Sequence, residues 1–236
     1  MDWLQRTEML FGDDALKRLA SAHVWIFGLG GVGSYTAMAL ARSGIGALTL
    51  VDGETVDITN INRQLQALHS TVGVQKTLAL ANILTDINPN ISLTLHDEFY
   101  SHDTQARLDF SNADYVADAI DTVTSKLLII ENAHKWNIPI ISAMGAGNKI
   151  NPSRFEVADI KKTSMCPLAR VMRRELKARG IDSLKVVYSQ EKARTPIGES
   201  PAAQDGRRAT PASCAFVPSV CGLIMAGEVV RELCGE

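Results

Sequence analysis

The sequence is poor in cysteine, in histidine and in long apolar runs. It has four cysteines, and no two of them are spaced Cys-x-x-Cys, which excludes a structural zinc site built from two such pairs. Four cysteines are also too few for a disulfide-held scaffold, and the scattered histidines suggest no metal cluster. The apolar run over residues 215–227 is too short to span a bilayer and indicates a buried helix. With no secretory signal recognised before the first expected strand, a reducing cytoplasm is the expected compartment.

The sequence does have enough length for a substantial core, together with an uneven distribution of charge. Its 236 residues are 46% hydrophobic and 21% charged, which is typical of a globular protein. Residues 1–150 carry 10 Lys and Arg against 16 Asp and Glu, whereas residues 151–210 carry 13 against 7. A polyanionic partner is therefore expected at the basic segment that follows residue 150.

The order of apolar and glycine-rich segments predicts an α/β fold. Two apolar strands over residues 24–28 and 48–52 enclose a glycine turn and a helix over residues 32–43, the opening unit of a Rossmann-like doubly wound, mostly parallel sheet with helices on both faces. Further strands are expected over residues 91–96, 115–119, 139–143, 154–160 and 184–188, and further helices over residues 74–87, 123–136, 167–179 and 216–233.

The change of character after residue 150 suggests two parts of one domain. Residues 1–150 are predicted to form the nucleotide-binding part, and residues 151–236 its C-terminal continuation. The continuation contains a basic helix, a loop over residues 189–213 that is expected to be mobile, and a closing helix.

The turn after the first strand reads Gly-Leu-Gly-Gly-Val-Gly and contains Gly28, Gly30, Gly31 and Gly33. Glycines at these positions let backbone N–H groups approach a phosphate at a helix N-terminus. Asp52 follows Gly33 by 19 residues, the usual distance for a carboxylate that bonds a ribose hydroxyl. Taken alone, the glycine motif and this carboxylate fit NAD as well as ATP.

A series of polar residues after the glycine turn favours ATP over NAD: Asn60, Arg63, Gln64, Lys76 and Asp121. Arg63 and Lys76 are expected to hold a triphosphate, and Asp121 to bind Mg²⁺ through oxygen. Asn60 and Gln64 would orient phosphate oxygens by hydrogen bonds. A hydride-transfer site would instead need a largely apolar nicotinamide pocket.

Each member of this series also has a structural interpretation. Asn60 could cap a turn, Arg63 could lie on the surface, Lys76 could be a solvated helix residue, and Asp121 could be the N-cap of the following helix. The joint occurrence of all of them supports the interpretation as an ATP site.

In this order the residues resemble the ubiquitin-activating, or E1-like, adenylating superfamily, which includes bacterial enzymes that adenylate sulfur-carrier proteins. The resemblance covers most of residues 5–145. Within the superfamily the chain is most similar to the family of tRNA threonylcarbamoyladenosine dehydratases, on Arg6 to Gly12, on residues 52–64 and on residues 162–170. The resemblance implies that residues 1–150 are an ATP-binding E1-like domain. It also implies a homodimer in which Arg6 reaches the nucleotide of the neighbouring subunit.

The resemblance implies a specific reaction. The enzyme would use ATP and Mg²⁺ to adenylate the threonyl carboxylate of N6-threonylcarbamoyladenosine in tRNA, next to the anticodon. Attack from within the same side chain would then close a ring and release AMP, with the net loss of one water. This step needs no enzyme nucleophile, because two groups of one side chain already have a high effective concentration.

Two other functions are weighed against the dehydratase. One is an enzyme that adenylates the C-terminus of a ubiquitin-like sulfur carrier, which the missing Cys-x-x-Cys pairs weaken. The other is a non-catalytic nucleotide-sensing scaffold, which the set of Arg6, Arg63, Lys76 and Asp121 opposes.

The family also implies partners and a location. The partners are tRNA carrying threonylcarbamoyladenosine, a second copy of the chain, and a cysteine desulfurase with a sulfur-acceptor protein; DNA is not expected. Some family members carry a further hydrophobic C-terminal tail. A cytoplasmic location is therefore expected, with membrane association only through such a tail.

The basic helix suits an RNA substrate. Arg170, Arg173, Arg174 and Lys177 are spaced so that most of them share one side of a helix. Because proteins contact RNA largely through phosphates and unpaired loop bases, this face is a predicted tRNA platform. The alternative is an ordinary solvated face.

The cysteines are weighed in the same way. Cys166 stands at the start of the basic helix, where it could be a nucleophile of lowered pKa, although a small packed residue is the favoured interpretation. Cys214 and Cys221 are expected to be core or cap residues. Cys234 lies near the end of the chain and is expected to be exposed, with weak support for a sulfur-relay role.

Overall fold

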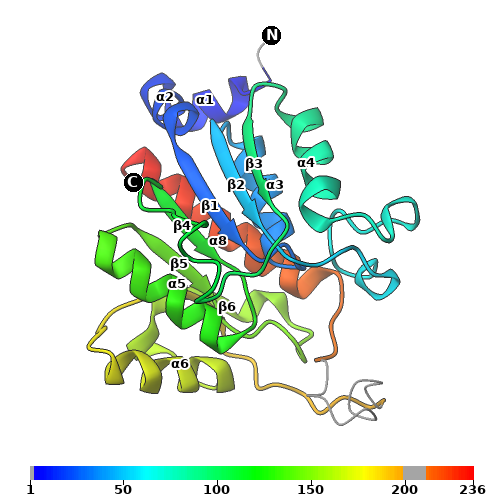
Figure 1. Cartoon of the computed structure of the whole chain (residues 1–236), viewed down its shortest axis with the longest axis vertical. Helices are drawn as coiled ribbons and strands as arrows, with labels where there is room; N and C mark the ends of the chain where they lie inside the picture. Colours follow the sequence, from blue (N-terminus) through cyan, green and yellow to red (C-terminus); the bar gives the residue numbers. More distant parts are fainter. Residues whose placement is uncertain (1–2, 199–210) are drawn as a thin grey trace.

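The computed structural model describes residues 3–198 and 211–236. A seven-stranded sheet with the order β3-β2-β1-β4-β5-β7-β6 forms its middle layer (Figure 1). The strands are β1 (His23–Phe27), β2 (Ala47–Val51), β3 (Ser92–His96), β4 (Tyr115–Asp118), β5 (Ile140–Ala143), β6 (Phe155–Asp159) and β7 (Lys185–Ser189). All neighbouring strands run parallel except β6 and β7, which are antiparallel. The predicted Rossmann-like, mostly parallel sheet is confirmed.

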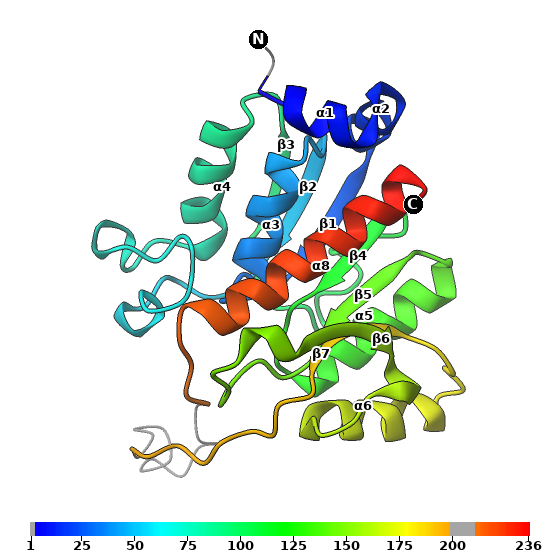
Figure 2. The same ribbon diagram turned by 180° about the vertical axis from the view of Figure 1, so that it is seen from behind.

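The central strands are apolar because helices cover both of their faces. One face carries α3 (Gly33–Arg42), α4 (Lys76–Ile87) and α8 (Phe216–Cys234), which Figure 2 shows from that side. The other face carries α5 (Val123–Trp136) and α6 (Pro167–Ala178). These five helices confirm the predicted ones, and their bounds differ from the predicted ranges by at most two residues at either end.

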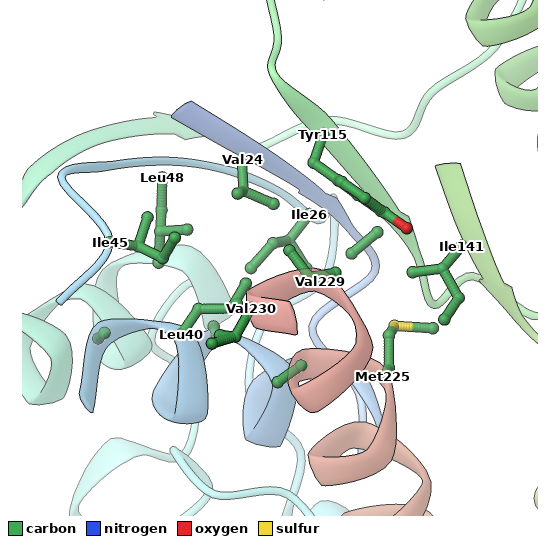
Figure 3. Packing of buried hydrophobic residues seen from close by; sticks show 14 of the residues in the cluster. Val24, Ile26, Leu40, Ile45, Leu48, Tyr115, Ile141, Met225, Val229 and Val230 are labelled. Atoms are coloured by element: carbon green, nitrogen blue, oxygen red, sulfur yellow. The ribbon is translucent and has the colours of Figure 1, made fainter. Parts of the chain in front are cut away.

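The largest core cluster lies between the sheet and helices α3 and α8. Val24 and Ile26 of β1 pack there against Leu40 of α3 and Val229 of α8 (Figure 3). The two helices cross closely at Gly222, where a Cβ would lie 2.2 Å from a carbonyl oxygen at the start of α3. Only glycine allows that approach. The apolar helix expected over residues 216–233 is thus present as α8 and packs directly against α3.

Two short helices that the sequence did not reveal precede the sheet, α1 (Gln5–Phe11) and α2 (Asp13–Ser21). They lie at the N-terminal ends of the strands, at the far end of β1 from its turn into α3 (Figure 1). The Gly46 N–H donates to the Leu19 carbonyl of α2 at 3.0 Å, which holds them there. Only Ala15 and Leu19 of α2 are buried, so the helix has too few apolar positions for a helical pattern to be recognised from the sequence.

Connecting segments complete the described chain. Short 3-10 turns are formed by Ile58–Asn60, His69–Thr71, Pro152–Arg154 and Ile160–Lys162. Residues 190–198 contain no helix or strand, and residues 199–210 of the loop that was expected to be mobile lie outside the described residues. Within the described ranges, no helix combines the length and apolar character needed to cross a bilayer.

Candidate functional site

The glycine turn joins the end of β1 to the start of α3. Gly28 has a φ of +84°, which favours glycine, and its N–H donates to the Val51 carbonyl at 2.9 Å. A Cβ at Gly33 would lie 1.8 Å from the Gly28 carbonyl oxygen, so this position also requires glycine. Gly30 faces open space instead, with the Gln64 Nε2 3.9 Å from a Cβ built on it. The turn therefore leaves room for a phosphate at the N-terminus of α3.

Two buried side chains hold Leu29, the residue between the first two glycines. Its N–H donates to Asp52 Oδ2 at 2.7 Å, and its carbonyl accepts from Gln66 Nε2 at 2.7 Å. Burial raises the pKa of the Asp52 carboxyl, while the Lys76 ammonium and two backbone N–H donors act in the opposite direction. Asp52 thus shapes the phosphate turn in addition to its predicted role toward a ribose. Gln66 was not predicted, since it belongs to no motif.

The segment after β2 brings three predicted residues next to the glycine turn. Asn60 Oδ1 accepts from the Asp57 N–H at 3.2 Å, which completes the capping box of a turn whose N-cap is Asp57, and within the described residues the Asn60 amide nitrogen makes no bond. Gln64 is buried opposite Gly30, and its Oε1 has no hydrogen-bond partner among the described atoms. Arg63 Nη1 donates to neighbouring oxygens of its own segment at 3.0 and 2.9 Å. Its other guanidinium donors make no bond within the described residues.

Lys76 is the first residue of α4 and is only 2% exposed. Its ammonium pairs with the carboxylate of Glu54, whose side chain is 59% exposed. The alternative of a solvated helix lysine is therefore wrong. Because Glu54 follows Asp52 by two residues, this pair places a buried cation beside the predicted ribose end of the site.

Asp121 follows β4 and is exposed at the same edge of the sheet. The N-cap of α5 is Thr122, so Asp121 is not the cap that the alternative interpretation proposed. Among the described residues its carboxylate accepts only from the Thr122 hydroxyl, at 3.4 Å. Within the described residues no three His, Cys, Asp or Glu side chains form a metal-binding group. A single carboxylate nevertheless fits Mg²⁺ that is held largely by phosphate oxygens and water.

A fully buried polar network begins at Asp118, three residues before Asp121, and was not predicted. Lys126 Nζ donates to Asp118 Oδ2 at 2.8 Å and to Ser142 Oγ at 3.0 Å, and Ser142 Oγ donates to Asp118 Oδ2 at 2.6 Å. Neither charged side chain is exposed. Asp118 Oδ1 also accepts from the Ile120 N–H at 3.2 Å. The network therefore joins β4, β5 and α5 around the turn that carries Asp121.

An exposed aromatic ring borders the site next to Asp52. Phe99 is 63% exposed, and a Cβ at Gly53 would lie 2.8 Å from its ring. An exposed ring in this place can stack on a base. No sequence pattern marked Phe99, since it follows an edge strand in an irregular segment.

Arg6 is the one predicted catalytic residue that the fold separates from the others. It is exposed on α1, at the N-terminal ends of the strands, whereas the glycine turn and Asp121 lie at their C-terminal ends (Figure 1).

The predicted tRNA-contacting residues lie on α6 and line a surface groove of about 520 Å³. Arg170 and Lys177 are exposed and make no ion pair within the described residues. Arg174 pairs with its neighbour Glu175. Arg173 is half-buried and donates to the Thr163 carbonyl at 2.7 Å, so it also holds the chain before α6 in place.

The cysteines are buried or half-buried, and none forms a disulfide. Cys166 packs in a core cluster with α6, as favoured above. Burial raises the pKa of the Cys221 thiol to about 12. The expectation that Cys234 is exposed is wrong: it is 5% exposed, because the last turn of α8 packs against α2.

The chain was compared with known proteins. The ThiF family model matches residues 4–236. The chain is 43% identical over 236 residues to the tRNA threonylcarbamoyladenosine dehydratase of Bacillus subtilis, covering 97% of this chain and 93% of that protein. The structure of Escherichia coli tRNA N6-threonylcarbamoyladenosine dehydratase in complex with AMP has a TM-score of 0.89 at 35% identity, covering 99% and 95% of the two chains. Its complex with ATP gives a TM-score of 0.88 at 34% identity, with the same coverage. This chain therefore belongs to the ThiF family.

Proposed function

We propose that this protein is an ATP-dependent dehydratase that acts on N6-threonylcarbamoyladenosine in tRNA. The observation that carries the proposal is the similarity to such a dehydratase along 97% of the chain. The structurally similar E. coli enzyme binds ATP and AMP, which accords with a site built around a phosphate turn and a buried lysine. A sulfur-carrier adenylating enzyme is the less favoured alternative.

The reaction consists of two displacements. An oxygen of the threonyl carboxylate forms a bond to the α-phosphorus of ATP, and the bond to pyrophosphate breaks. A second group of the same modified side chain then attacks the activated carboxyl carbon, and AMP leaves with the carboxyl oxygen. The protein contributes mainly by positioning the two substrates and neutralising developing charge.

The site residues divide these tasks. The backbone N–H groups of the turn from Gly28 to Gly33 would face the phosphates, and Asp52 the ribose. Arg63 and Lys76 would balance the charge of the triphosphate, with Asn60 and Gln64 donating to its oxygens. The exposed ring of Phe99 would stack on the adenine.

Magnesium fits the free carboxylate of Asp121. The residue is exposed at the same edge of the sheet as the phosphate turn, and in the described part of the chain its only donor is the Thr122 hydroxyl at 3.4 Å. Asp121 would hold the ion together with phosphate oxygens, and bound Mg²⁺ supplies positive charge that favours departure of pyrophosphate.

The proposal includes a homodimer with a shared site. Arg6 lies at the opposite end of the sheet from its own glycine turn, so a role in catalysis requires a second copy (Figure 1). Met9 and Leu10 of α1 are 83% and 75% exposed, which offers apolar surface for such a contact. Mixing inactive Arg6→Ala with inactive Asp121→Asn protein should partly restore activity, because one site of each mixed dimer is then intact. No restoration would place Arg6 outside the site.

The groove on α6 is proposed to contact the tRNA backbone through Arg170, Arg174 and Lys177. A cytoplasmic location, where tRNA is modified, and an association with a cysteine desulfurase and its sulfur acceptor complete the proposal.

The proposal is tested on the nucleoside itself. The protein is incubated with Mg-ATP and tRNA that carries threonylcarbamoyladenosine, and the digested nucleosides are weighed by mass spectrometry. Loss of one water from that nucleoside, with formation of AMP, is the expected result. Asp121→Asn, a substitution at an exposed position, should abolish the reaction without changing the melting temperature. An unchanged nucleoside in the presence of bound ATP would move the substrate to a protein carboxylate.

A further inference from the structure

The structure buries three lysines among its described residues: Lys76, Lys126 and Lys149. The first two are each paired with a carboxylate. Lys149, which is 4% exposed, has no acidic partner within the described residues. Within residues 3–198 and 211–236, its Nζ donates only to the carbonyls of Gly145, at 2.7 Å, and Gly147, at 3.5 Å. A buried ammonium that faces only neutral groups has lost hydration without gaining a counter-charge, so an anionic ligand would stabilise it.

Lys149 lies at the same edge of the sheet as the nucleotide site. Residues 144–149 follow β5, which pairs with β4, the strand that leads to Asp121. In turn β4 pairs with β1, which leads into the glycine turn. Neighbouring strands are about 4.8 Å apart, so the ends of β1 and β5 are separated by roughly 10 Å along this edge. A carboxylate that attacks an α-phosphate over β1 is expected within this interval.

The first turn of α8 confirms that the two loops are neighbours. A Cβ at Gly31, in the glycine turn, would lie 3.0 Å from the side chain of Pro218. Four residues earlier, the Cys214 thiol lies 3.9 Å from the Lys149 carbonyl oxygen. The start of α8 therefore contacts both the phosphate turn and the loop that carries Lys149.

The position of Lys149 distinguishes between the anions of the reaction. The cations proposed for the triphosphate, Arg63 and Lys76, come from segments after β2, on one side of the glycine turn. Lys149 comes from the other side, beyond β4 and beyond Asp121, the proposed Mg²⁺ ligand that lies between it and the glycine turn. In an in-line displacement the attacking oxygen approaches the α-phosphorus opposite the departing pyrophosphate. The acceptor carboxylate is therefore expected on the side of Lys149.

We infer that the Lys149 ammonium binds the carboxylate of the acceptor, the group that attacks the α-phosphate. The inference rests on the proposed function and names the protein group that recognises the threonyl carboxylate. The carboxylate oxygen forms its bond to phosphorus as the bond to pyrophosphate breaks. Lys149 transfers no proton and offers a charged hydrogen bond throughout.

The test measures recognition of the carboxylate separately from turnover. Dissociation constants are measured, with a non-cleavable ATP analogue present, for tRNA carrying threonylcarbamoyladenosine and for the same tRNA with unmodified adenosine. The wild type should prefer the modified tRNA. Lys149→Met should lose roughly 10- to 100-fold of that preference, as expected for removal of a hydrogen bond to a charged group. Lys149→Arg should keep most of it, as should Lys162→Met, which alters an exposed lysine.

Two further measurements make the result specific. The affinity of Lys149→Met for ATP without tRNA should equal that of the wild type, and its thermal unfolding should remain cooperative. If Lys149→Met does not fold, Lys149→Gln, which can still donate to the Gly145 carbonyl, replaces it. Glu199→Gln and Asp205→Asn remove carboxylates that lie outside the described residues. They should leave the preference unchanged.

Several outcomes would overturn the inference. Lys149→Met could retain the full preference, or it could lose ATP affinity alone, which would assign the lysine to the phosphates. A gain of preference in Glu199→Gln or Asp205→Asn would identify a counter-charge within the chain, because its removal would free the ammonium for the substrate carboxylate. Failure of the proposed function is distinct from all of these, because the wild type itself would then show neither preference nor AMP formation.

Discussion

The buried pair of Asp118 and Lys126 allows a strong prediction about stability. Both side chains are fully buried, and the Lys126 ammonium lies 2.8 Å from the carboxylate. In Lys126→Met the ammonium is lost, and the Asp118 carboxylate keeps only the Ser142 hydroxyl and the Ile120 N–H as partners. Leaving one member of such a pair without its counter-charge costs about 3–5 kcal/mol.

The matched variant is Asp118→Asn combined with Lys126→Met. It removes both charges, and the new amide can accept from the Ile120 N–H and donate to the Ser142 hydroxyl. Because replacing a whole buried ion pair with neutral groups is often tolerated, the double variant should lie within about 1–2 kcal/mol of the wild type. The single variant alone should therefore lose a large share of a typical stability of about 5–15 kcal/mol.

Urea unfolding followed by circular dichroism measures both variants. With a slope of about 2–3 kcal/mol per molar urea, Lys126→Met should lower the midpoint by roughly 1–2.5 M, and the double variant by roughly 0.3–1 M. The reasoning is refuted if the double variant is as unstable as Lys126→Met, because packing and not the unpaired charge would then set the cost. A Lys126→Met protein as stable as the wild type would refute it equally.

Three further predictions concern the phosphate turn, the cysteines and the basic helix. Gly33→Ala should lower the melting temperature sharply, because its Cβ would lie 1.8 Å from a carbonyl oxygen, whereas Gly30→Ala should melt like the wild type; equal melting of the two would contradict this geometry. Burial raises the pKa of the Cys221 thiol from 9.0 to about 12. The buried neutral thiol therefore contributes fully to the free energy of unfolding below pH 9, and this contribution is lost as the pH rises toward 12, because the unfolded thiol ionises first. In the native protein iodoacetamide should modify half-buried Cys214 before Cys221, as peptide mass mapping would show; the reverse order would contradict the burial. Arg173→Gln should lower the free energy of unfolding by about 1 kcal/mol in urea titrations, since its guanidinium donates to backbone carbonyls; an unchanged midpoint would show that those bonds contribute nothing.

The sequence predicted the strands and helices of the sheet well because their apolar periods are long and are separated by clear turns. Each of the seven strands was expected close to its observed position. The helices α1 and α2 were missed because they bury few residues, Ala15 and Leu19 alone in α2. The prediction that Cys234 is exposed is wrong because α8 stays packed against the core through its last turn.

The candidate site was only partly accessible to sequence reasoning. The glycine turn, Asp52 and Lys76 belong to recognisable local patterns, and the fold brings them together. Gln66 and Lys149 belong to none, and their significance lies in what their side chains contact or lack. Such contacts arise between segments far apart in the chain, so no local pattern records them.

The sequence by itself determined the sheet and its order of elements, and it predicted which residues would face a nucleotide, because these depend on periodicity and on the spacing of turns. Only the tertiary structure decided which charges are paired. Asp118 and Ser142 come from neighbouring parallel strands and meet Lys126 from the helix between them. Burial then makes each pairing energetically significant, and likewise the lack of an acidic partner for Lys149 among the described residues, because water no longer screens the charge.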